Sequence, residues 1–240
     1  MKLFNWDNIR LLLMFVLVIF LFSFTSKRNS HRKLTKSTVV FVGENALFLR
    51  QEIVNKLLIE NNSNATSIQK DRLDLNKLEQ TLNAQDMIDK SDVFVSIDGV
   101  LKAVVKQKTP IARVFDKKGS FYVDSEGDTM PLSANFTARV PLVSGEMNKK
   151  NSKDLSKLFK VIYDDAFLKK NIIGIQIMPN GSLLMLNRNY NYQIDFGKMI
   201  NVERKFKNYK AFFQKVSSDS SLYKYKKIDL RFTEQVVCTK

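Results

Sequence analysis

The sequence contains one cysteine and one histidine among 240 residues, and this scarcity excludes several kinds of functional site. Cys238 has no second cysteine with which to form an intramolecular disulfide, and one cysteine with one histidine cannot build a zinc cluster. His31 lies in the polar, basic stretch SKRNSHRKLTKS, where a solvated imidazole without a ligand is expected. A Cys-His catalytic pair is therefore not predicted, and Cys238 is interpreted as a structural or free thiol.

The carboxylates do not form a recognisable catalytic or metal-binding set either. Asp124, Glu126 and Asp128 alternate in DSEGD, but this run lacks the remaining oxygen ligands and the bidentate glutamate of an EF-hand loop. A turn is the better interpretation. Asp164 and Asp165 stand at a predicted helix end without a catalytic partner in view. Because no nucleophile, base and orienting residue occur at a recognisable spacing, no enzyme is predicted.

The formal charge of +15 is concentrated towards the two ends of the chain. A basic protein invites a nucleic-acid interpretation, because lysine and arginine neutralise phosphates. No RNP, zinc-finger or helix-turn-helix pattern accompanies the charge, and the lysines near the carboxyl terminus are scattered among apolar positions. An anionic membrane surface or an acidic protein partner explains the same charge, and no nucleic acid is predicted.

One long apolar run, LLLMFVLVIFLF, occupies residues 11–22. It is short for a membrane span, which needs about 20 residues, so Trp6, Ile9 and a snorkelling Arg10 must contribute to it. No small-x-small cleavage site follows the run, which favours an uncleaved anchor over a removed signal peptide. The sequence predicts a short cytoplasmic tail at 1–10, a transmembrane anchor at 11–26 and a solvated linker at 27–37.

The basic residues around the span point to one orientation. Lys2 and Arg10 precede it, whereas five basic residues follow between Lys27 and Lys36. Counted literally, the positive-inside rule places the bulk of the chain in the cytoplasm.

After the linker, the apolar pattern predicts a strand and then two helices. TVVFVG has the character of a strand that Gly43 ends, and apolar residues between Leu47 and Leu58 follow at near-helical spacing. Asn76 with Glu79 three residues later resembles a capping box that opens a second short helix.

A hairpin follows these helices. Val93, Val95 and Ile97 alternate with polar neighbours, and Leu101, Ala103 and Val105 alternate again. The dipeptide Asp98-Gly99 between them predicts a type I′ turn. The order strand, helix, helix, strand, strand can bury both helices on one face of a three-stranded sheet.

The next section is rich in strands. The runs IARVF, SFYVD and ARVPLV are separated by turn residues such as Lys118-Gly119 and Glu126-Gly127. A helix with a Ser152 cap is predicted to pack on this sheet. Its apolar stripe consists of Leu155, Leu158, Phe159 and Ile162.

The carboxyl-terminal third continues with a hairpin, a helix and a final strand. IIGIQIM and SLLMLN flank Pro179-Asn180-Gly181, a strong hairpin signal. A buried helix face is predicted from 202 to 216, where the apolar side chains recur every three or four residues. Those side chains are Val202, Phe206, Tyr209, Phe213 and Val216. Ile228, Leu230 and Phe232 alternate with polar residues, which predicts a terminal strand with these three on one face.

These motifs, taken in order, resemble the FtsQ/DivIB family from the anchor to Cys238. TVVFVG with a helix and then VFVSIDGVLKAVVKQKTPIARV is similar to the POTRA domain of the family. FYVDSEGDTMPLS and RVPLVSG resemble the beginning of its β domain, and KIDLRFTEQVVCTK resembles its last strand in the Bacteroidetes form. The resemblance implies an α+β fold with a transmembrane helix, a β-α-α-β-β POTRA domain at 38–108 and a mostly antiparallel β domain with flanking helices at 109–240.

The resemblance also implies a location and a function. The POTRA and β domains would lie in the periplasm at the division septum, which reverses the orientation from the charge count. The protein would be a non-catalytic scaffold without a cofactor or metal that links early division proteins to FtsB and FtsL and so to septal peptidoglycan synthesis. Two alternatives remain open: a POTRA-containing translocation or membrane-assembly component, and a membrane-anchored periplasmic enzyme.

The family binds FtsB by strand addition at the C-terminal sheet edge, so backbone groups would supply affinity and alternate side chains specificity. The resemblance implies six contact residues: Arg231, Phe232, Lys227, Glu234, Tyr209 and Phe213. Lys227 stands where some members carry an aromatic. Three other interpretations remain: Phe232 as a core residue, Arg231 with Asp229 as a surface ion pair, and Tyr209 with Phe213 as helix core.

Overall fold

A computed structural model describes most of the chain in two compact units, Met1–Gln107 and Lys108–Lys240, which we treat separately. The described residues are 6–30, 33–43, 48–59, 73–117, 119–148, 150–217 and 221–240. The predictions made for His31, Leu47 and Lys118 lie outside these ranges.

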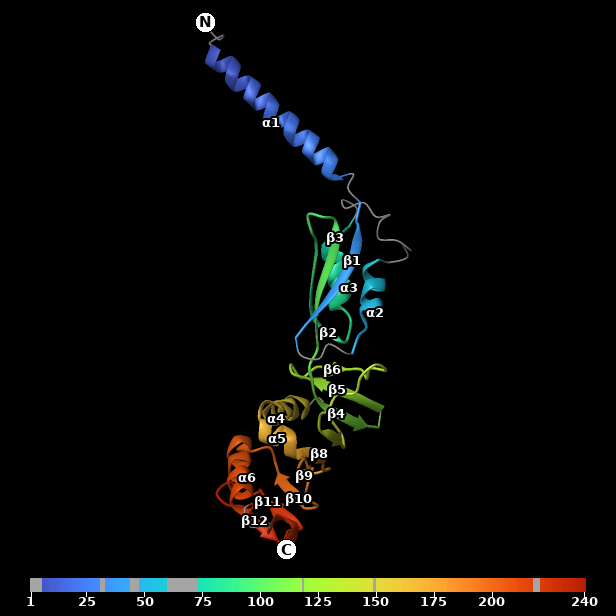
Figure 1. Ribbon diagram of the computed structural model, residues 1–240. Coiled ribbons are helices and arrows are strands. Elements are labelled where there is room, and N and C mark those ends of the chain that lie inside the picture. Colours follow the sequence, from blue (N-terminus) through green and yellow to red (C-terminus); the bar gives the residue numbers. More distant parts are fainter. Residues whose placement is uncertain are drawn as a thin grey trace. The chain divides into compact units, whose positions relative to one another are not determined.

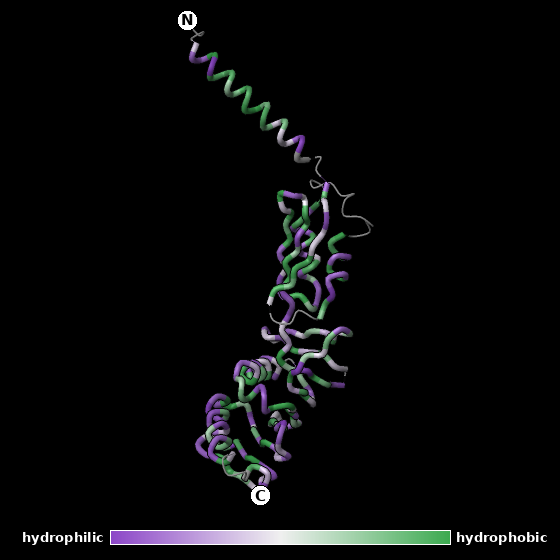
Figure 2. Tube along the Cα trace, viewed as in Figure 1, coloured by the Kyte–Doolittle hydropathy of each residue, from purple (hydrophilic) through white to green (hydrophobic). Residues whose placement is uncertain are grey.

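The helix α1, Trp6–Ser30, contains the predicted anchor. Its stretch from Trp6 to Arg28 is 23 residues long with a mean hydropathy of 2.4, so by length and composition it can cross a membrane. Figure 2 shows the hydrophobic residues continuous along α1 and polar residues at its two ends. Trp6, Ile9 and Arg10 belong to this helix, as the short apolar run required.

The predicted linker at 27–37 is largely absorbed into secondary structure. The helix α1 continues to Ser30, and the strand β1, Lys36–Val42, begins inside the predicted linker. Leu34 is only 1% exposed and belongs to the core of the first unit. The structure thus differs from the predicted solvated linker at Leu34, which is buried, whereas Lys33, Thr35 and Lys36 are exposed.

Five residues, 31–35, therefore separate the end of α1 from the start of β1. Of these the structure describes 33–35, and Leu34 fixes them to the first unit. The chain thus passes from the anchor into the folded unit almost directly.

The first unit has the predicted order of strand, helix, helix, strand, strand, and the fold class is confirmed. Two helices pack on one face of a sheet ordered β1-β3-β2, in which β1 is parallel and β2 antiparallel to β3. The further elements are α2 Gln51–Leu58, α3 Leu75–Asn83, β2 Ile88–Val95 and β3 Val100–Gln107. Alternation along β3 places Leu101, Ala103 and Val105 in the core, each fully buried.

The cap of α3 differs from the prediction. Asp74 is the N-cap residue, and its carboxylate accepts a hydrogen bond from the backbone N–H of Lys77 at 3.0 Å. Asn76 lies inside the helix, so the capping box of Asn76 with Glu79 was wrong. Both residues offer an oxygen, but only Asp74 has the extended backbone that an N-cap needs.

The β2–β3 turn also differs from the predicted type. A type I′ turn needs positive φ at both central residues, whereas only Gly99 has it, at +80°. Ser96 accepts a hydrogen bond from Gly99 N–H at 3.0 Å, and Ser96 N–H donates to Val100 at 2.9 Å. The loop is therefore the three residues Ile97 to Gly99, a type I turn closed by a left-handed glycine.

The second unit is built on a mixed nine-stranded sheet with the order β12-β11-β10-β9-β8-β7-β4-β5-β6. Its first strands are β4 Pro110–Asp116, β5 Gly119–Asp124, β6 Thr129–Met130 and β7 Leu142–Ser144. Its later strands are β8 Ile172–Ile177, β9 Leu183–Asn187, β10 Gln193–Gly197, β11 Lys227–Asp229 and β12 Val237–Thr239. The pairs β4–β7, β7–β8 and β10–β11 are parallel and the others antiparallel.

Helices cover one face of this sheet (Figure 1). They are α4 Ser152–Asp164, α5 Ala166–Asn171 and α6 Val202–Ser217, with the short 3₁₀ helix η3 Ser221–Lys224 after α6. The predicted stripe on α4 is buried, and so are Phe206 and Tyr209 of α6. These side chains meet the inward-facing strand residues in one hydrophobic core.

Two local predictions for this unit were wrong. Of the run ARVPLV only the last two residues join a strand, β7, because Pro141 has no N–H to donate to a ladder. The N-cap of α4 is Asn151, and Ser152 is already the first helical residue. The Asn151 side chain instead accepts from Asn148 N–H at 2.8 Å and so ties down the preceding turn.

The glycine after β7 provides a test of this packing. Gly145 has a φ of +106°, and a Cβ added there would lie 2.5 Å from the backbone oxygen of Ile177. We expect Gly145→Ala to destabilise the second unit by about 2–4 kcal/mol, because it adds a left-handed strain and displaces β8. Chemical unfolding of the full chain in mild detergent, followed by circular dichroism, measures this loss.

Gly181→Ala is the matched control for that experiment. Gly181 also has positive φ, +77°, but nothing lies within 4 Å of an added Cβ. It should cost only the backbone strain, about 1–2 kcal/mol. Equal losses in the two variants would contradict the close approach of β7 and β8.

Candidate interaction surface

The end of the chain is organised differently from the single terminal strand that was predicted. The strand β11 ends at Asp229, and Phe232 lies in a bend outside it. Ile228 and Leu230 are buried, but Phe232 is 48% exposed and so does not share their surroundings. The alternation therefore stops after Leu230, and the prediction that these three residues share one strand face was wrong.

The strand β12 follows and covers the outer side of β11. The two are antiparallel, with Ile228 opposite Cys238 and Asp229 opposite Val237. Residues that face each other across an antiparallel pair lie on the same side of the sheet, so Cys238 points towards the core and Val237 away from it. The C-terminal edge of the sheet, within the part of the chain that the structure describes, is thus β12.

Two carboxylates lie side by side just inside this edge. Asp195 of β10 is in register with Asp229 of β11, and both side chains are largely buried. Lys227 lies 2.8 Å from Asp195, and Arg231 donates from Nε to both oxygens of Asp229 at 3.0 Å. Arg231 Nε is also 3.5 Å from Asp195, so two cations balance two carboxylates.

The arginine is held where it can serve both carboxylates. Hydrogen bonds from the Arg231 side chain, against the opposing effect of burial, lower the pKa of Asp229 below its ordinary value of 3.8. The Arg231 side chain lies against the backbone of Gly197. A Cβ added at Gly197 would lie 2.7 Å from Arg231 Cγ. A side chain at that position would push Arg231 away from Asp229.

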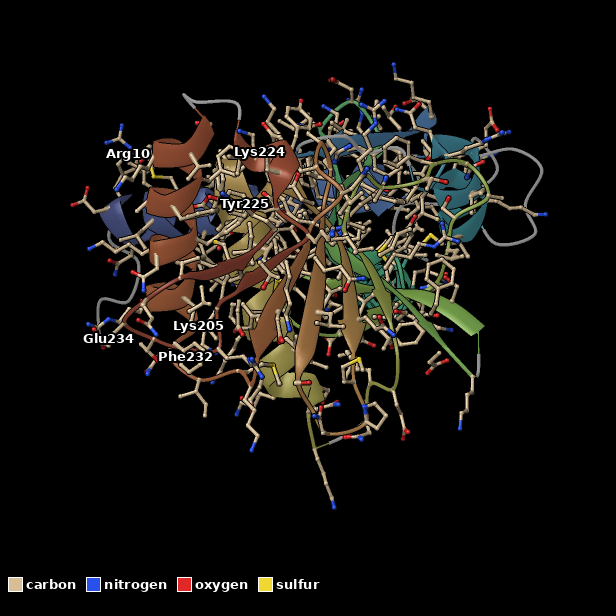
Figure 3. The ribbon with its side chains drawn as sticks, turned by 90° about the horizontal axis from the view of Figure 1, so that it is seen from below. Arg10, Lys205, Lys224, Tyr225, Phe232 and Glu234 are labelled. Carbon is tan, nitrogen blue, oxygen red and sulfur yellow. The ribbon has the colours of Figure 1, made fainter. Side chains whose placement is uncertain are left out.

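The loop between β11 and β12 is fastened to α6. Asn208 donates to the backbone oxygen of Thr233 at 2.7 Å, and Arg204 pairs with Glu234 at 2.5 Å. Figure 3 shows Phe232 and Glu234 near the end of α6 that carries Lys205. This loop therefore presents Phe232 on a supported backbone next to the edge strand.

A buried lysine supports the same end of α6. Lys205 is 3% exposed, and its ammonium donates to the backbone oxygens of Phe196 and Lys198 at 2.8 and 2.9 Å. Burial lowers the pKa of Lys205, while the nearby Asp195 and Asp229 partly oppose that effect. The lysine thus joins α6 to the end of β10.

The two aromatic residues predicted on α6 are placed in the interior. Tyr209 is fully buried, and its hydroxyl lies 2.9 Å from that of Tyr192 and accepts a hydrogen bond from Asn187 at 3.0 Å. Phe213 is half-buried and its ring packs edge-on against Phe167 at 4.9 Å. Tyr209 and Phe213 therefore pack beneath the candidate surface. Of the other four predicted contact residues, Arg231, Phe232 and Glu234 are exposed and Lys227 is half-buried.

Comparison with known proteins identifies the family of this unit. A model of the family described as FtsQ/DivIB, C-terminal related, matches residues 109–239, more than half of the chain. The chain belongs to this family. The match to FtsQ/DivIB contains all nine strands and all six predicted contact residues.

Membership of the FtsQ/DivIB family indicates a role in cell division, and the family is of the scaffold type. Together with the apolar α1, it fits a membrane-anchored division protein. Among solved structures, the major extracytoplasmic domain of the trans isomer of the cell division protein DivIB from Geobacillus stearothermophilus is similar at 12% identity, with a TM-score of 0.32. That likeness covers 47% of this chain and 96% of the other. Among curated proteins, none matches the sequence.

The sequence pattern missed the features that define the edge of this FtsQ/DivIB unit. The separate strand β12 was read as part of one terminal strand, and Asp195 and Lys205 were not singled out. Val236 and Val237 carry a signal that could have revealed β12, since two consecutive β-branched residues follow the polar pair Glu234-Gln235.

The remaining candidate sites have structural roles. Asp124 accepts from Glu126 N–H at 3.0 Å and Asp128 N–H at 2.8 Å, which confirms a turn in DSEGD. Asp165 caps α5 and pairs with Lys210 at 2.5 Å. Within the described ranges, no group of three or more His, Cys, Asp or Glu side chains could hold a metal ion.

The Arg231–Asp229 pair predicts a pH-dependent contribution to stability. Because the folded-state pKa of Asp229 is lowered, its contribution is present above about pH 3.8 and is lost as the pH falls through the lower folded-state value. Arg231→Met keeps the aliphatic stem over Gly197 but removes the charge. We expect this variant to be less stable than wild type at pH 7, with a gap that narrows below pH 3.8 in unfolding experiments.

The control for this prediction is Arg204→Met, which breaks an ion pair whose two side chains are both mostly exposed. Its effect should be small, about 0–1 kcal/mol. If the gap for Arg231→Met stayed constant from pH 7 to pH 3, the pairing with Asp229 would not be the source of the stabilisation.

Proposed function

We propose that this protein is a non-catalytic divisome scaffold of the inner membrane, with both units in the periplasm at the division septum. It captures FtsB, and with it FtsL, by strand addition at β12. Through these partners it couples earlier division proteins, which meet the first unit, to septal peptidoglycan synthesis. The family assignment supports the division role, and the edge strand supports the mode of binding.

One observation carries the proposal. The strand β12 ends the nine-stranded sheet, and its outward-facing Val237 is 41% exposed beside the supported loop that carries Phe232. An edge strand presents backbone N–H and C=O groups that a partner strand can pair with, while exposed side chains select the partner. The opposite edge, β6, is only two residues long and its Met130 is fully buried, so it offers less to a partner.

The charge around β12 indicates the chemistry of the partner. Lys226 precedes β11 and donates its backbone N–H to Thr239 at 2.8 Å, which brings it beside β12. Lys240 follows the edge strand directly, and both lysines are exposed. A partner segment with acidic residues would be attracted by this charge, and its association would weaken with salt.

The test is binding of the FtsB extracytoplasmic segment to the full chain in nanodiscs. Phe232→Ala removes an exposed aromatic whose ring centre lies 5.9 Å from the Arg231 guanidinium, and it leaves all four charged groups of the carboxylate cluster in place. We expect it to weaken binding by about 30-fold, the equivalent of about 2 kcal/mol, because exposed aromatics are common anchors of interfaces. Isothermal titration calorimetry gives the affinity.

Phe115→Ala is a matched control, because Phe115 is 41% exposed on β4, six strands away from β12 in the sheet order. It should bind as wild type does. Failure of the folded wild-type protein to bind would overturn the proposed partner, and equal losses in the two variants would overturn the proposed site.

A further inference from the structure

The tip of the β2–β3 hairpin in the first unit exposes a large apolar side chain that the proposed function does not use. Ile97 is 86% exposed, more than any other large apolar side chain in the described part of the chain. It occupies the first position of the three-residue loop that Gly99 closes. An isoleucine at the tip of a tight turn contributes nothing to the core of the unit. Its exposure therefore raises the question of what the side chain contacts outside the unit.

The tip is joined to the segment that leaves the membrane anchor. Thr35 donates its backbone N–H to the oxygen of Gly99 at 2.8 Å, and its hydroxyl donates to the oxygen of Asp98 at 3.3 Å. The neighbouring Leu34 is buried in the core of the same unit. The hairpin tip and residues 34–35 are therefore held side by side by these contacts.

The covalent chain sets how far this piece can lie from the membrane. Ser30 ends α1, and three peptide links lead to Lys33, which limits their separation to about 11 Å in any conformation. Arg28, where the apolar span ends, lies about 3 Å earlier along the helix axis. Since the headgroup region on each side of a bilayer is about 5–8 Å thick, this limit of about 14 Å keeps Lys33 in or close to the headgroup region, within reach of the tip.

The sheet topology places the tip at the end of the sheet where the chain enters from α1. Strand β1 begins beside the tip, with Lys36 opposite Val100, and runs away from it parallel to β3. The end of the sheet at which the chain enters is thus the end that carries the hairpin turn, as Figure 1 shows within this unit. The tip is the part of the sheet nearest to the point where the chain arrives from α1.

The charge next to the tip fits anionic lipid headgroups. Five basic residues and no acidic residue lie between Lys27 and Lys36, and Asp98 is the one carboxylate of the turn itself. Basic residues beside a membrane span are attracted to anionic lipids, and an apolar side chain among them can enter the interface. We propose that the β2–β3 hairpin tip, led by Ile97, rests in the headgroup region of the leaflet at which α1 leaves the membrane.

This contact gives the first unit a second attachment to the bilayer. Without it, the covalent connection to α1 would be the only attachment of the unit to the bilayer. With Ile97 and the basic segment both at the interface, the long direction of the sheet is held away from the membrane plane. The inference depends on α1 as a membrane anchor and is independent of the identity of the division partner.

The experiment measures the depth of a spin label in the full chain reconstituted in nanodiscs of phosphatidylethanolamine and phosphatidylglycerol. Cys238→Ser removes the natural thiol, and a nitroxide is attached in Ile97→Cys or in Pro179→Cys. Pro179 begins the matching three-residue loop in the second unit, which a left-handed glycine also closes. We expect the rate at which a water-soluble nickel chelate collides with the label at position 97 to be at most about one third of the rate at position 179.

Two comparisons complete the test. Nanodiscs of phosphatidylcholine alone should reduce the protection at position 97, because they remove the anionic headgroups; unchanged protection there would overturn the part of the proposal that rests on charge. Equal nickel accessibility at 97 and 179 in both kinds of disc would overturn the lipid contact. Protection at 97 that arises only after another protein is added would overturn it in favour of a protein partner.

Discussion

The pairing of two carboxylates with two cations beside the sheet edge determines how the carboxyl terminus is organised. Asp195 and Asp229 occupy adjacent positions on parallel strands, where each alone would be costly to bury. Lys227 and Arg231 neutralise them, and Arg231 can do so only because the chain turns out of the sheet after Leu230. That turn separates β11 from β12 and leaves β12 at the edge.

The same turn connects the edge to the helical layer. The loop that contains Phe232 is fixed to α6 by Arg204 and Asn208, and α6 is fixed to the end of β10 by Lys205. Tyr209 and Phe213 belong to α6, and their aromatic side chains pack in the core on the inner side of the helix. A short edge strand is therefore presented by a well-supported frame, which is the arrangement that strand addition requires.

Sequence patterns predicted the elements that depend on local periodicity. The stripe from Leu155 to Ile162 and the alternation of Leu101, Ala103 and Val105 are buried as expected, because burial follows the period of a helix or strand. The family resemblance was confirmed over residues 109–239. The six contact residues remain a proposal, within which the structure distinguishes exposed Phe232 from buried Tyr209.

What could not be predicted depends on contacts between distant segments. The burial of Asp229 follows from its position next to Asp195, and alternation alone placed its side chain at the surface. The three-residue strand β12 is too short to show a period, and its pairing with β11 follows from the intervening turn. Similarly, Asp74 and not Asn76 caps α3 because Asp74 has the extended backbone conformation of an N-cap residue. The sequence alone does not show which of the two residues has that conformation.

Backbone amide hydrogen exchange of the full chain, with and without the FtsB segment, tests the central claim most directly. The account predicts that exchange slows at residues 237–239 when FtsB binds, because the outer amides of β12 acquire partners from an added strand. Binding that leaves exchange in β12 unchanged and slows it elsewhere would contradict strand addition at this edge.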